Sequence, residues 1–411
     1  MSPSLLHPLL AEGDPIYAHG IGLGVVIIVC VKVIVAFAVL LVSVLMMVWF
    51  ERKVISDMQN RIGPDRAGRW GILQSVADGI KLFFKEDLLP DNADRRIFRL
   101  APYLSAVPAF LSFAIVPVGG TITLFHHTTE LQVADPPMGI LFLLAMSAVA
   151  VYGVMLAGWS SGSKYPLLGS VRASAQMVSY EAALGLSIAS VVLVTGGLTT
   201  REMVDNQNGV IYSFIPNWNV FRLGFVPFVI FLLAATAELN RPPFDLVEAE
   251  QELVGGFHTE YSSIRFALFY LAEFMNTVTM SAIVVTLFLG GPDGPGFHFL
   301  PWLWPILWFV GKTMLFLFTY VWLRATLPRL RYDQLMDLGW KRLIPVSLVW
   351  LLVLAAMLIN LRWGFAVFAG CVVFFGLLIR SMRVGAQRRE LEEAASMSVP
   401  PPPGRTLEGA S

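Results

Sequence analysis

The sequence predicts an all-α polytopic membrane protein: a bundle of about nine transmembrane helices plus one amphipathic helix along the membrane surface. Three observations support this fold class. Hydrophobic residues make up 56% of the 411-residue chain, charged residues only 14%, and the mean hydropathy is +0.68. A soluble globular chain carries about 25% charged residues. A soluble multidomain protein of this length is therefore close to excluded.

Apolar runs long enough to cross a bilayer recur along the chain. The hydrocarbon core is about 30 Å thick and needs about 20 mostly apolar residues per helix. Nine segments qualify, and the fifth and ninth are the shortest: residues 22–49, 100–120, 138–158, 175–194, 223–237, 264–289, 303–323, 343–361 and 366–378. No Lys or Arg precedes the first run, so we expect a retained span and not a cleaved signal peptide.

The placement of the charges predicts the orientation. Lys+Arg and Asp+Glu both number 29, so the net charge alone says little. Most cations follow the odd-numbered spans, and the positive-inside rule then places the N-terminus outside and the C-terminus in the cytoplasm. We expect one transmembrane domain at residues 1–384, with cytoplasmic loops at 51–99 and 238–263. Residues 385–411, charged and then Pro-rich, should form a disordered cytoplasmic tail.

The chain shows no signature of a metal, a nucleotide cofactor or a nucleic-acid site. Cys30 and Cys371 lie far apart in apolar runs, and the six histidines have no metal-ligand spacing. No Walker loop, dinucleotide fingerprint or CxxC is present, and the basic excess typical of nucleic-acid binding is missing. If the protein serves redox chemistry, we expect the cofactors on other chains.

The predicted loop at 51–99 is too long and too patterned for a simple connector. After a turn region rich in Gly, Pro and Arg, residues 70–85 show an amphipathic helical pattern. Its apolar face holds Leu73, Val76, Ala77, Ile80, Phe83 and Phe84, and its polar face holds Gln74, Asp78, Lys81 and Lys85. Such a helix suits the membrane interface. It either packs on its own bundle or forms a lid over an opening for a lipid-soluble ligand.

A quinone is one ligand that would suit such an opening. Its headgroup presents two carbonyl acceptors, to which Arg, Lys or a protonated carboxyl group donates. The candidate groups at this loop are Arg52, Arg61, Asp78 and Lys81. Arginines at a membrane boundary are also common anchors, so the pattern alone leaves both interpretations open.

The loop after the fifth span is acidic, where an inside loop normally carries positive charge. It contains Glu238, Asp245, Glu248, Glu250, Glu252 and Glu260 against one cation, Arg241. Pro242 and Pro243 should break any helix that continues from the span. If residues 244–254 are helical, Asp245, Glu248 and Glu252 share one face and Glu250 points roughly opposite. Burial of that face would raise at least one carboxyl pKa.

Two further acids, Glu181 and Glu273, lie inside apolar runs. An ionisable residue at membrane depth is costly, usually faces the bundle interior and is a functional candidate by default. With the loop acids, these two form a candidate chain of proton-exchanging groups from the cytoplasmic side towards the midplane. Structural hydrogen bonds and ion pairs are the alternative. Lys32 and Lys312 are candidate counter-ions, although Lys32 is also placed to snorkel.

Two long motifs in these loops closely resemble one family, the H-type membrane subunits of proton-translocating NADH–quinone oxidoreductase, or respiratory complex I, which include mitochondrial NADH dehydrogenase subunit 1. The first motif comprises Glu51-Arg52-Lys53, MQNRIGP at 58–64, QSVADGIKL at 74–82 and Lys85-Glu86. The second is AELNRPPFDLVEAEQELV at 237–254, continued by Glu260-Tyr261 and Ala272-Glu273. The resemblance covers about residues 20–360.

The resemblance implies a membrane-arm component that encloses the quinone chamber together with two hydrophilic-arm subunits and that contacts small membrane-arm subunits. It implies no cofactor on this chain: NAD, FMN and iron–sulfur clusters belong to partner subunits, and ubiquinone or menaquinone is the substrate. The helix near Asp78 would flank quinone access. The acids that would link quinone reduction to the antiporter-like subunits are Glu181, Glu238, Asp245, Glu248, Glu250, Glu252 and Glu273.

The chain departs from the family's common eight-span pattern at its C-terminus. A ninth apolar run and a Pro-rich tail are added there, which fits a protein of the bacterial cell membrane better than an organellar one. Two alternatives remain open at this point. One is the related subunit of a membrane-bound hydrogenase or ferredoxin-linked complex, and the other is a stand-alone proton-coupled secondary transporter.

Overall fold

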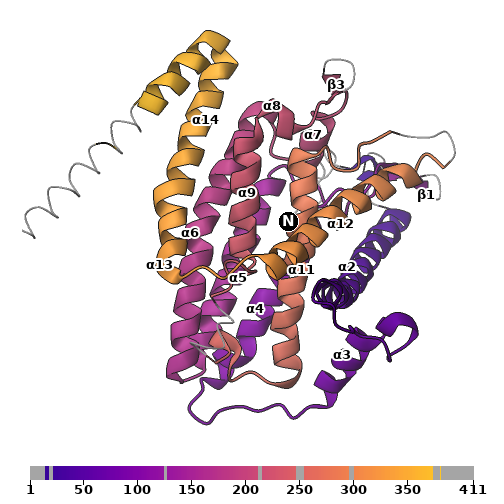
Figure 1. The fold of residues 1–411 in the computed structure, drawn as a ribbon. Helices are drawn as coiled ribbons and strands as arrows, with labels where there is room; N and C mark the ends of the chain where they lie inside the picture. The colour runs from indigo at the N-terminus through magenta and orange to yellow at the C-terminus, as the bar shows by residue number, and fades with distance from the viewer. Residues whose placement is uncertain are drawn as a thin grey trace, which may run out of the picture. The chain divides into compact units, whose positions relative to one another are not determined.

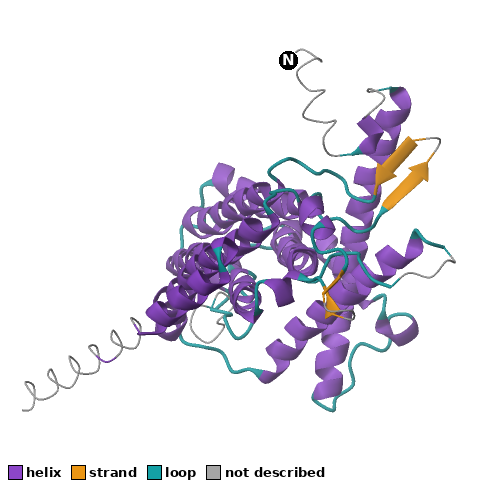
Figure 2. Cartoon of the chain, turned by 90° about the horizontal axis from the view of Figure 1, so that it is seen from above, coloured by secondary structure: helices purple, strands orange, loops and turns teal. Residues whose placement is uncertain are grey.

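The computed structural model describes residues 14–17, 22–124, 127–211, 215–246, 254–295, 300–373 and 380. These residues are mostly helical, with two small antiparallel hairpins (Figure 2). The chain divides into two compact units, residues 1–351 and 352–411, and the boundary falls inside α14 (Ile344–Ile359). The second unit contains a short apolar helix, Leu361–Val373. The predicted disordered tail at 385–411 lies outside the described residues.

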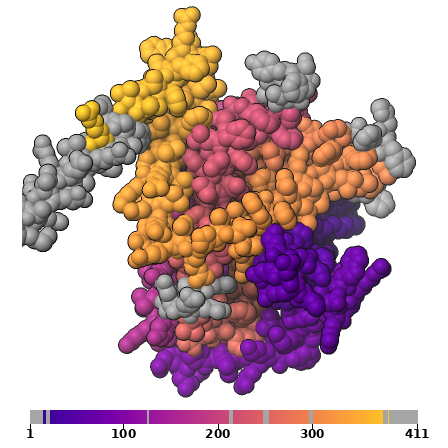
Figure 3. Space-filling view, in the orientation of Figure 1, coloured from indigo at the N-terminus to yellow at the C-terminus, as the bar shows by residue number. Residues whose placement is uncertain are grey.

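Within the described residues of the first unit, seven helices build the bundle. They are α2 (Leu23–Met58), α4 (Arg95–Phe113), α5 (Gly139–Ser160), α6 (Lys164–Thr195), α9 (Phe225–Glu238), α11 (Ser263–Phe288) and α12 (Leu303–Thr326). In Figure 1, α5, α6, α9 and α11 run side by side, and α4 packs against both α5 and α11. The central helix is α11, whose apolar stretch is 83% buried. Figure 3 shows α12 and α2 side by side on one face.

The prediction of a helical membrane protein is confirmed. Each predicted span overlaps a helix, the ninth as far as residue 373, where that described range ends. Within the described residues, six helices are long and apolar enough to cross a membrane: α2, α5, α6, α11, α12 and the stretch Tyr332–Ile359. The fifth predicted span corresponds to α9, which is short, as expected. The helix of the first predicted span, α2, continues past Trp49 to Met58, so the first residues of the predicted loop at 51–99 are helical.

The predicted interfacial helix is shorter than expected. A 3-10 turn, η2 (Arg69–Gly71), precedes α3 (Gln74–Phe84), and Trp70 inside that turn has a positive φ of 60°, which ends helical continuity. Gly71 also has a positive φ, and a Cβ there would lie 2.4 Å from the Pro64 backbone. The apolar side chains of α3 remain exposed, at 70% for Phe83 and 88% for Phe84. Its contact with lipid stays a prediction.

One end of the bundle, which we call the hairpin end, carries both small sheets. Strand β1 (Thr121–Leu124) pairs with β2 (His127–Glu130), and β3 (Val210–Ile211) pairs with β4 (Ile215–Pro216). The short helices α7 (Thr200–Asp205) and α8 (Asn219–Arg222) lie in the same connection as β3 and β4, and η1 (Pro15–Tyr17) contacts β2. The opposite end, which we call the acidic end, holds α3, η3 (Gly256–His258) and α13 (Tyr332–Leu338), followed by a π-helical turn at Gly339–Leu343.

The structure assigns the two lysines inside predicted spans to the hairpin end. Lys32 Nζ lies 2.7 Å from Asp14 Oδ2. Lys312 Nζ donates to the backbone carbonyls of Leu289, Gly291 and Asp293 at 2.7, 3.0 and 2.7 Å, just beyond the last turn of α11. The expectation that they are counter-ions of the buried carboxylates was therefore wrong. Hydropathy predicts that a lysine lies within a membrane span, but it does not identify the group with which the lysine pairs.

Candidate functional site

The acidic end is shaped by the early end of α9. At 1.5 Å per residue, its 14 residues span about 21 Å, against a hydrocarbon core of about 30 Å. The backbone that follows is irregular, and a membrane protein tolerates irregular backbone where protein buries it. Gln176 of α6 satisfies two of the freed carbonyls, donating through Nε2 to Ala237 at 2.7 Å and to Phe244 at 2.8 Å. The predicted break before Pro242-Pro243 is confirmed.

Glu238 is the last residue of α9 and is buried. The sequence had placed it in a loop. Its Oε1 accepts a hydrogen bond from Ser147 Oγ of α5, whereas its Oε2 has no hydrogen-bond partner within the described residues. Glu181 of α6 and Tyr320 of α12 are its electrostatic neighbours. The carboxyl group of Glu238 is thus only half satisfied and lies beside a second acid.

A cluster of four charges adjoins Glu238, with Glu51 and Arg241 buried and Glu273 and Arg324 half-buried. Arg241 is 4% exposed, and its Nη1 lies 3.0 Å from Glu51 Oε2 while its Nε lies 3.2 Å from Glu273 Oε1. Arg324 of α12 forms a second ion pair with Glu51, and the Arg241 guanidinium lies over the ring of Phe274. Two cations thus balance two carboxylates, as buried charges require. We call this set the charge cluster: Glu51, Arg241, Glu273 and Arg324.

The sequence did not identify three members of the charge cluster as site residues. Glu51 was assigned to a loop because its charge marked the end of an apolar run. A signal was present: Leu40, Val44, Met47 and Glu51 follow helical 4-3-4 spacing, and all four are buried on one face of α2. Arg241 appeared as the single cation of an acidic loop. Arg324 gave no signal beyond its position at a membrane boundary.

The other predicted acids have different outcomes. Asp245 is buried, and its Oδ2 accepts from Arg329 Nη2 at 2.8 Å, so a cation compensates it. Residues Phe244–Leu246 form a turn and not the start of the predicted helix. Glu248, Glu250 and Glu252, with residues 247–253 of that predicted helix, lie outside the described residues.

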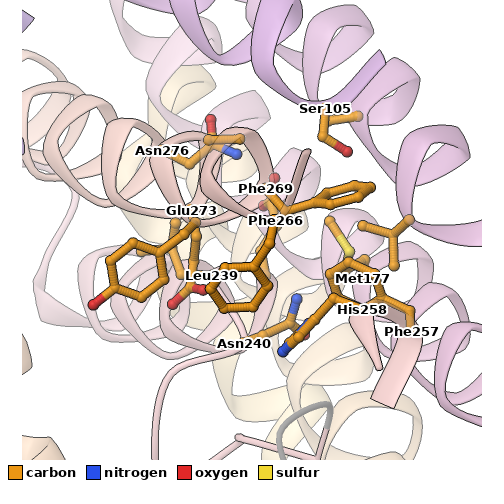
Figure 4. A pocket seen from close by; sticks show the side chains of 15 residues that line it. Ser105, Met177, Leu239, Asn240, Phe257, His258, Phe266, Phe269, Glu273 and Asn276 are labelled. Carbon is orange, nitrogen blue, oxygen red and sulfur yellow. The ribbon is translucent and has the colours of Figure 1, made fainter. Parts of the chain in front are cut away.

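A cavity of about 70 Å³ separates Glu238 from the loop that carries η3. A water needs roughly 10–15 Å³ of such space, so the cavity has room for several. Its polar lining includes Glu238, Asn240, His258, Tyr270, Glu273 and Asn276. In Figure 4, Asn276 and Ser105 lie at one end, Asn240 and His258 at the other, and the rings of Phe266 and Phe269 between them. A second cavity of about 20 Å³ shares Glu238 and Asn276 and extends the polar path towards Ser147.

A separate charged group lies where α2 meets α3. Arg52 Nη1 is 2.6 Å from Asp78 Oδ2, Gln74 Nε2 donates to Asp78 Oδ1 at 3.2 Å, and Lys81 Nζ lies 3.9 Å from the same oxygen. The structure therefore brings together three of the four residues predicted for quinone access. Arg61 is exposed in the turn after α2, and its backbone N–H donates to the Ser56 carbonyl.

A larger cavity, about 470 Å³, lies between α2, α11 and α12. Its walls are almost wholly apolar; of the two hydroxyl groups, Ser43 Oγ already donates to its own helix at Val39. This space suits hydrocarbon and offers few donors for a headgroup. No three His, Cys, Asp or Glu side chains come together as a metal site in the ranges that the structure describes.

Comparison with known proteins agrees with these features. A family model described as NADH dehydrogenase matches residues 31–355. A protein of Frankia alni, named as the H subunit of NADH-quinone oxidoreductase, is 50% identical, covering 89% of this chain and 82% of the relative. Proteins of the same name from Frankia casuarinae and Streptomyces avermitilis are 49% and 47% identical, each covering 92% of this chain and 87% and 88% of the relative. The chain therefore belongs to the NADH dehydrogenase family, as the H subunit of NADH-quinone oxidoreductase does.

Proposed function

We propose that this chain is a membrane subunit of NADH–quinone oxidoreductase that forms part of the quinone chamber and couples quinone reduction to proton translocation. The names of relatives at 47–50% identity support the enzyme complex. They favour it over a hydrogenase-linked complex and over a stand-alone transporter. One observation carries the coupling role: Glu51, Glu238 and Arg241 are buried, and Glu238 and Glu273 line one cavity with room for water.

The charge cluster is suited to respond to a change in local charge. Arg241 is shared between Glu51 and Glu273, so protonation of one carboxylate strengthens its pairing with the other. Glu273 and Glu238 line the same cavity, and water between them would allow proton exchange. Such coupled acids titrate as a group and not one by one. A proton gained at one end of the group therefore changes the charge state at the other.

Quinone access is proposed at the junction of α2 and α3. Arg52 and Lys81 supply donors, Asp78 holds them, and the exposed apolar face of α3 suits the lipid that delivers the quinone. Quinone takes up two electrons from the iron–sulfur chain of partner subunits and two protons to form quinol. The rest of the chamber would come from two hydrophilic-arm subunits, and small membrane-arm subunits would contact the bundle.

The proposed orientation follows the cations. The acidic end, with the basic loop around α3, would face the cytoplasm of a bacterial cell, and the hairpin end would face outside. In this orientation the charge cluster lies on the side from which electrons arrive. The proposed domain, residues 1–384, would lie in the membrane with the tail in the cytoplasm.

The test replaces Glu238 or Glu273 with Gln in the assembled complex. Each variant should lower coupled quinone reduction and proton pumping at least tenfold, because a proton-transferring group typically contributes about 10²–10⁴-fold. NADH oxidation by a water-soluble acceptor that bypasses quinone should be unchanged. Glu202→Gln, an exposed acid on α7, is the matched control. The same assay on Glu248→Gln and Glu252→Gln tests the loop acids.

Normal assembly with wild-type turnover and a wild-type proton-to-electron ratio in both Glu238→Gln and Glu273→Gln would contradict the proposal. A loss of coupling in the Glu202 control would show that any acid-to-amide change disturbs the assay.

A further inference from the structure

His258 occupies a position that the proposed function does not use. It is the last residue of η3 at the acidic end, is half-buried, and lines the cavity that contains Glu238 and Glu273. Figure 4 shows its side chain at the Asn240 end of that cavity. His258 therefore lies between the surface and the buried carboxylates.

The loop that carries His258 is held firmly on both sides. The backbone of α6 approaches it so closely that a Cβ on Gly169 would lie 2.8 Å from Gly256 Cα. Beyond His258, the ring of Tyr261 stacks on Phe98 with centroids 4.0 Å apart, and its hydroxyl donates to the Phe98 carbonyl at 3.1 Å. Ser262 Oγ donates to the Glu86 carbonyl at 2.8 Å. The imidazole is thus presented to the cavity from a fixed backbone.

The surroundings of the ring keep it uncharged. Phe257 and Phe266 contact it edge-to-face, with centroids 4.9 and 5.4 Å away. Burial against these rings lowers the pKa of His258 to about 4, so the neutral form dominates at pH 7. A neutral imidazole has one N–H donor and one acceptor nitrogen. It can accept a proton on one side and release one on the other without becoming a stable cation.

The acid–base groups around His258 belong to several elements. Within the cavity these are Glu238 at the end of α9, and Tyr270 and Glu273 on α11. Glu260 and Tyr261 follow His258 along the same loop, and burial raises the pKa of Tyr261 to about 12, so that hydroxyl stays protonated. The acceptors that a proton from His258 can reach inside the cavity are thus the two carboxylates, directly or through water.

We propose that His258 is the group through which protons pass between the cytoplasmic surface and the cavity carboxylates, an inference that rests on the proposed coupling function. A proton binds the outward ring nitrogen while the inward nitrogen releases its own proton to a cavity water or to a carboxylate. One proton moves inward, and the ring is left in its other tautomer. Rotation of the ring, or return of the proton, resets it.

The test uses two variants in the assembled complex. His258→Phe keeps the aromatic packing between Phe257 and Phe266 but removes both nitrogens, and it should lower coupled quinone reduction at least tenfold. His258→Ala should lower coupled quinone reduction by as much, and added imidazole should then raise the activity of this variant several-fold. NADH oxidation by a water-soluble acceptor should be unchanged in both. His127→Gln, on β2 at the hairpin end, is the control and should behave as wild type.

The outcomes separate this inference from the function on which it rests. Wild-type coupled turnover in His258→Phe would show that His258 is only a packed ring, and a loss in His258→Ala that imidazole does not restore would also overturn the relay. If Glu238→Gln loses coupling while His258→Phe keeps it, only this inference fails. If His258→Phe, Glu238→Gln and Glu273→Gln all keep full coupling, the proposed function fails as well.

Discussion

The two ends of the bundle satisfy their buried polar groups to different degrees, although Asn219 Oδ1 at the hairpin end also lacks a hydrogen-bond partner within the described residues. At the hairpin end, Gln207 is fully buried and fully paired: its Nε2 donates to Met203 and Thr286 carbonyls, and its Oε1 accepts from the backbone of Asn219 and Gly290. At the acidic end, Glu238 Oε2, Asn240 Oδ1 and Arg241 Nη2 lack hydrogen-bond partners within the described residues. These atoms lie beside or near a cavity, whereas Gln207 lies among backbone groups.

This contrast shows how one bundle can be both rigid and responsive. A polar network whose members are all paired is held in one arrangement, and losing any member is costly. A network with spare acceptors and room for water can gain or lose protons without unfolding. The hairpin end is therefore suited to be the fixed support, and the acidic end to be the part whose charge state can change.

The largest expected effect comes from breaking the charge cluster. Arg241→Met removes one of the two cations that pair with the buried carboxylate of Glu51, and it also removes the ion pair between Arg241 and Glu273. Removing one partner of a buried ion pair typically costs about 3–5 kcal/mol. We expect little assembled complex in the membrane, measured by native electrophoresis and by its thermal midpoint. Arg331→Met, whose side chain is 81% exposed, should stay near wild type. Normal assembly of Arg241→Met would show that the cluster is not needed for folding.

A smaller loss of stability is expected from a change at the hairpin end, and coupled quinone reduction should be unaffected. Lys312→Met removes three hydrogen bonds to backbone carbonyls beyond α11. Leaving buried acceptors unpaired costs roughly 1–3 kcal/mol, so the thermal midpoint should fall. Coupled turnover per assembled complex should not change. Lys341→Met, on an exposed lysine, is the control. A coupling defect in Lys312→Met would remove the distinction between the two ends.

The smallest effect is expected at Asp135, and it depends on pH. Burial raises the pKa of Asp135 from 3.8 to about 6, although Gln132 and Thr200 partly oppose the rise. The native state therefore favours the protonated form, and its contribution to stability is full below about pH 4 and lost as the pH rises through about 6. Asp135→Asn stays neutral, so it should raise the thermal midpoint at pH 8 and change it little at pH 4. An equal gain at both values would rule out ionisation as the cause.

Much of the fold could be predicted from the sequence, because bilayer thickness and apolar run length constrain helices directly. The early end of α9 was also predictable from Pro242-Pro243. The partners of the charges could not be predicted, because Glu51 and Arg241 are 190 residues apart and meet only where the tertiary fold brings α2 to the turn after α9. For the same reason the assignment of Lys32 and Lys312 as counter-ions was wrong. Depth in the membrane can be read from composition, whereas pairing depends on the tertiary structure.

The early end of α9 also makes this segment intolerant of changes in length. Consecutive residues of an α-helix are rotated by about 100° around its axis. One residue inserted into α9 would turn the Glu238 carboxylate away from Ser147 and would shift Ala237 relative to Gln176. Loops elsewhere tolerate insertions because they adjust at the surface. The end of α9 is buried and cannot shift in this way, so the number of residues in α9 matters as much as their identity.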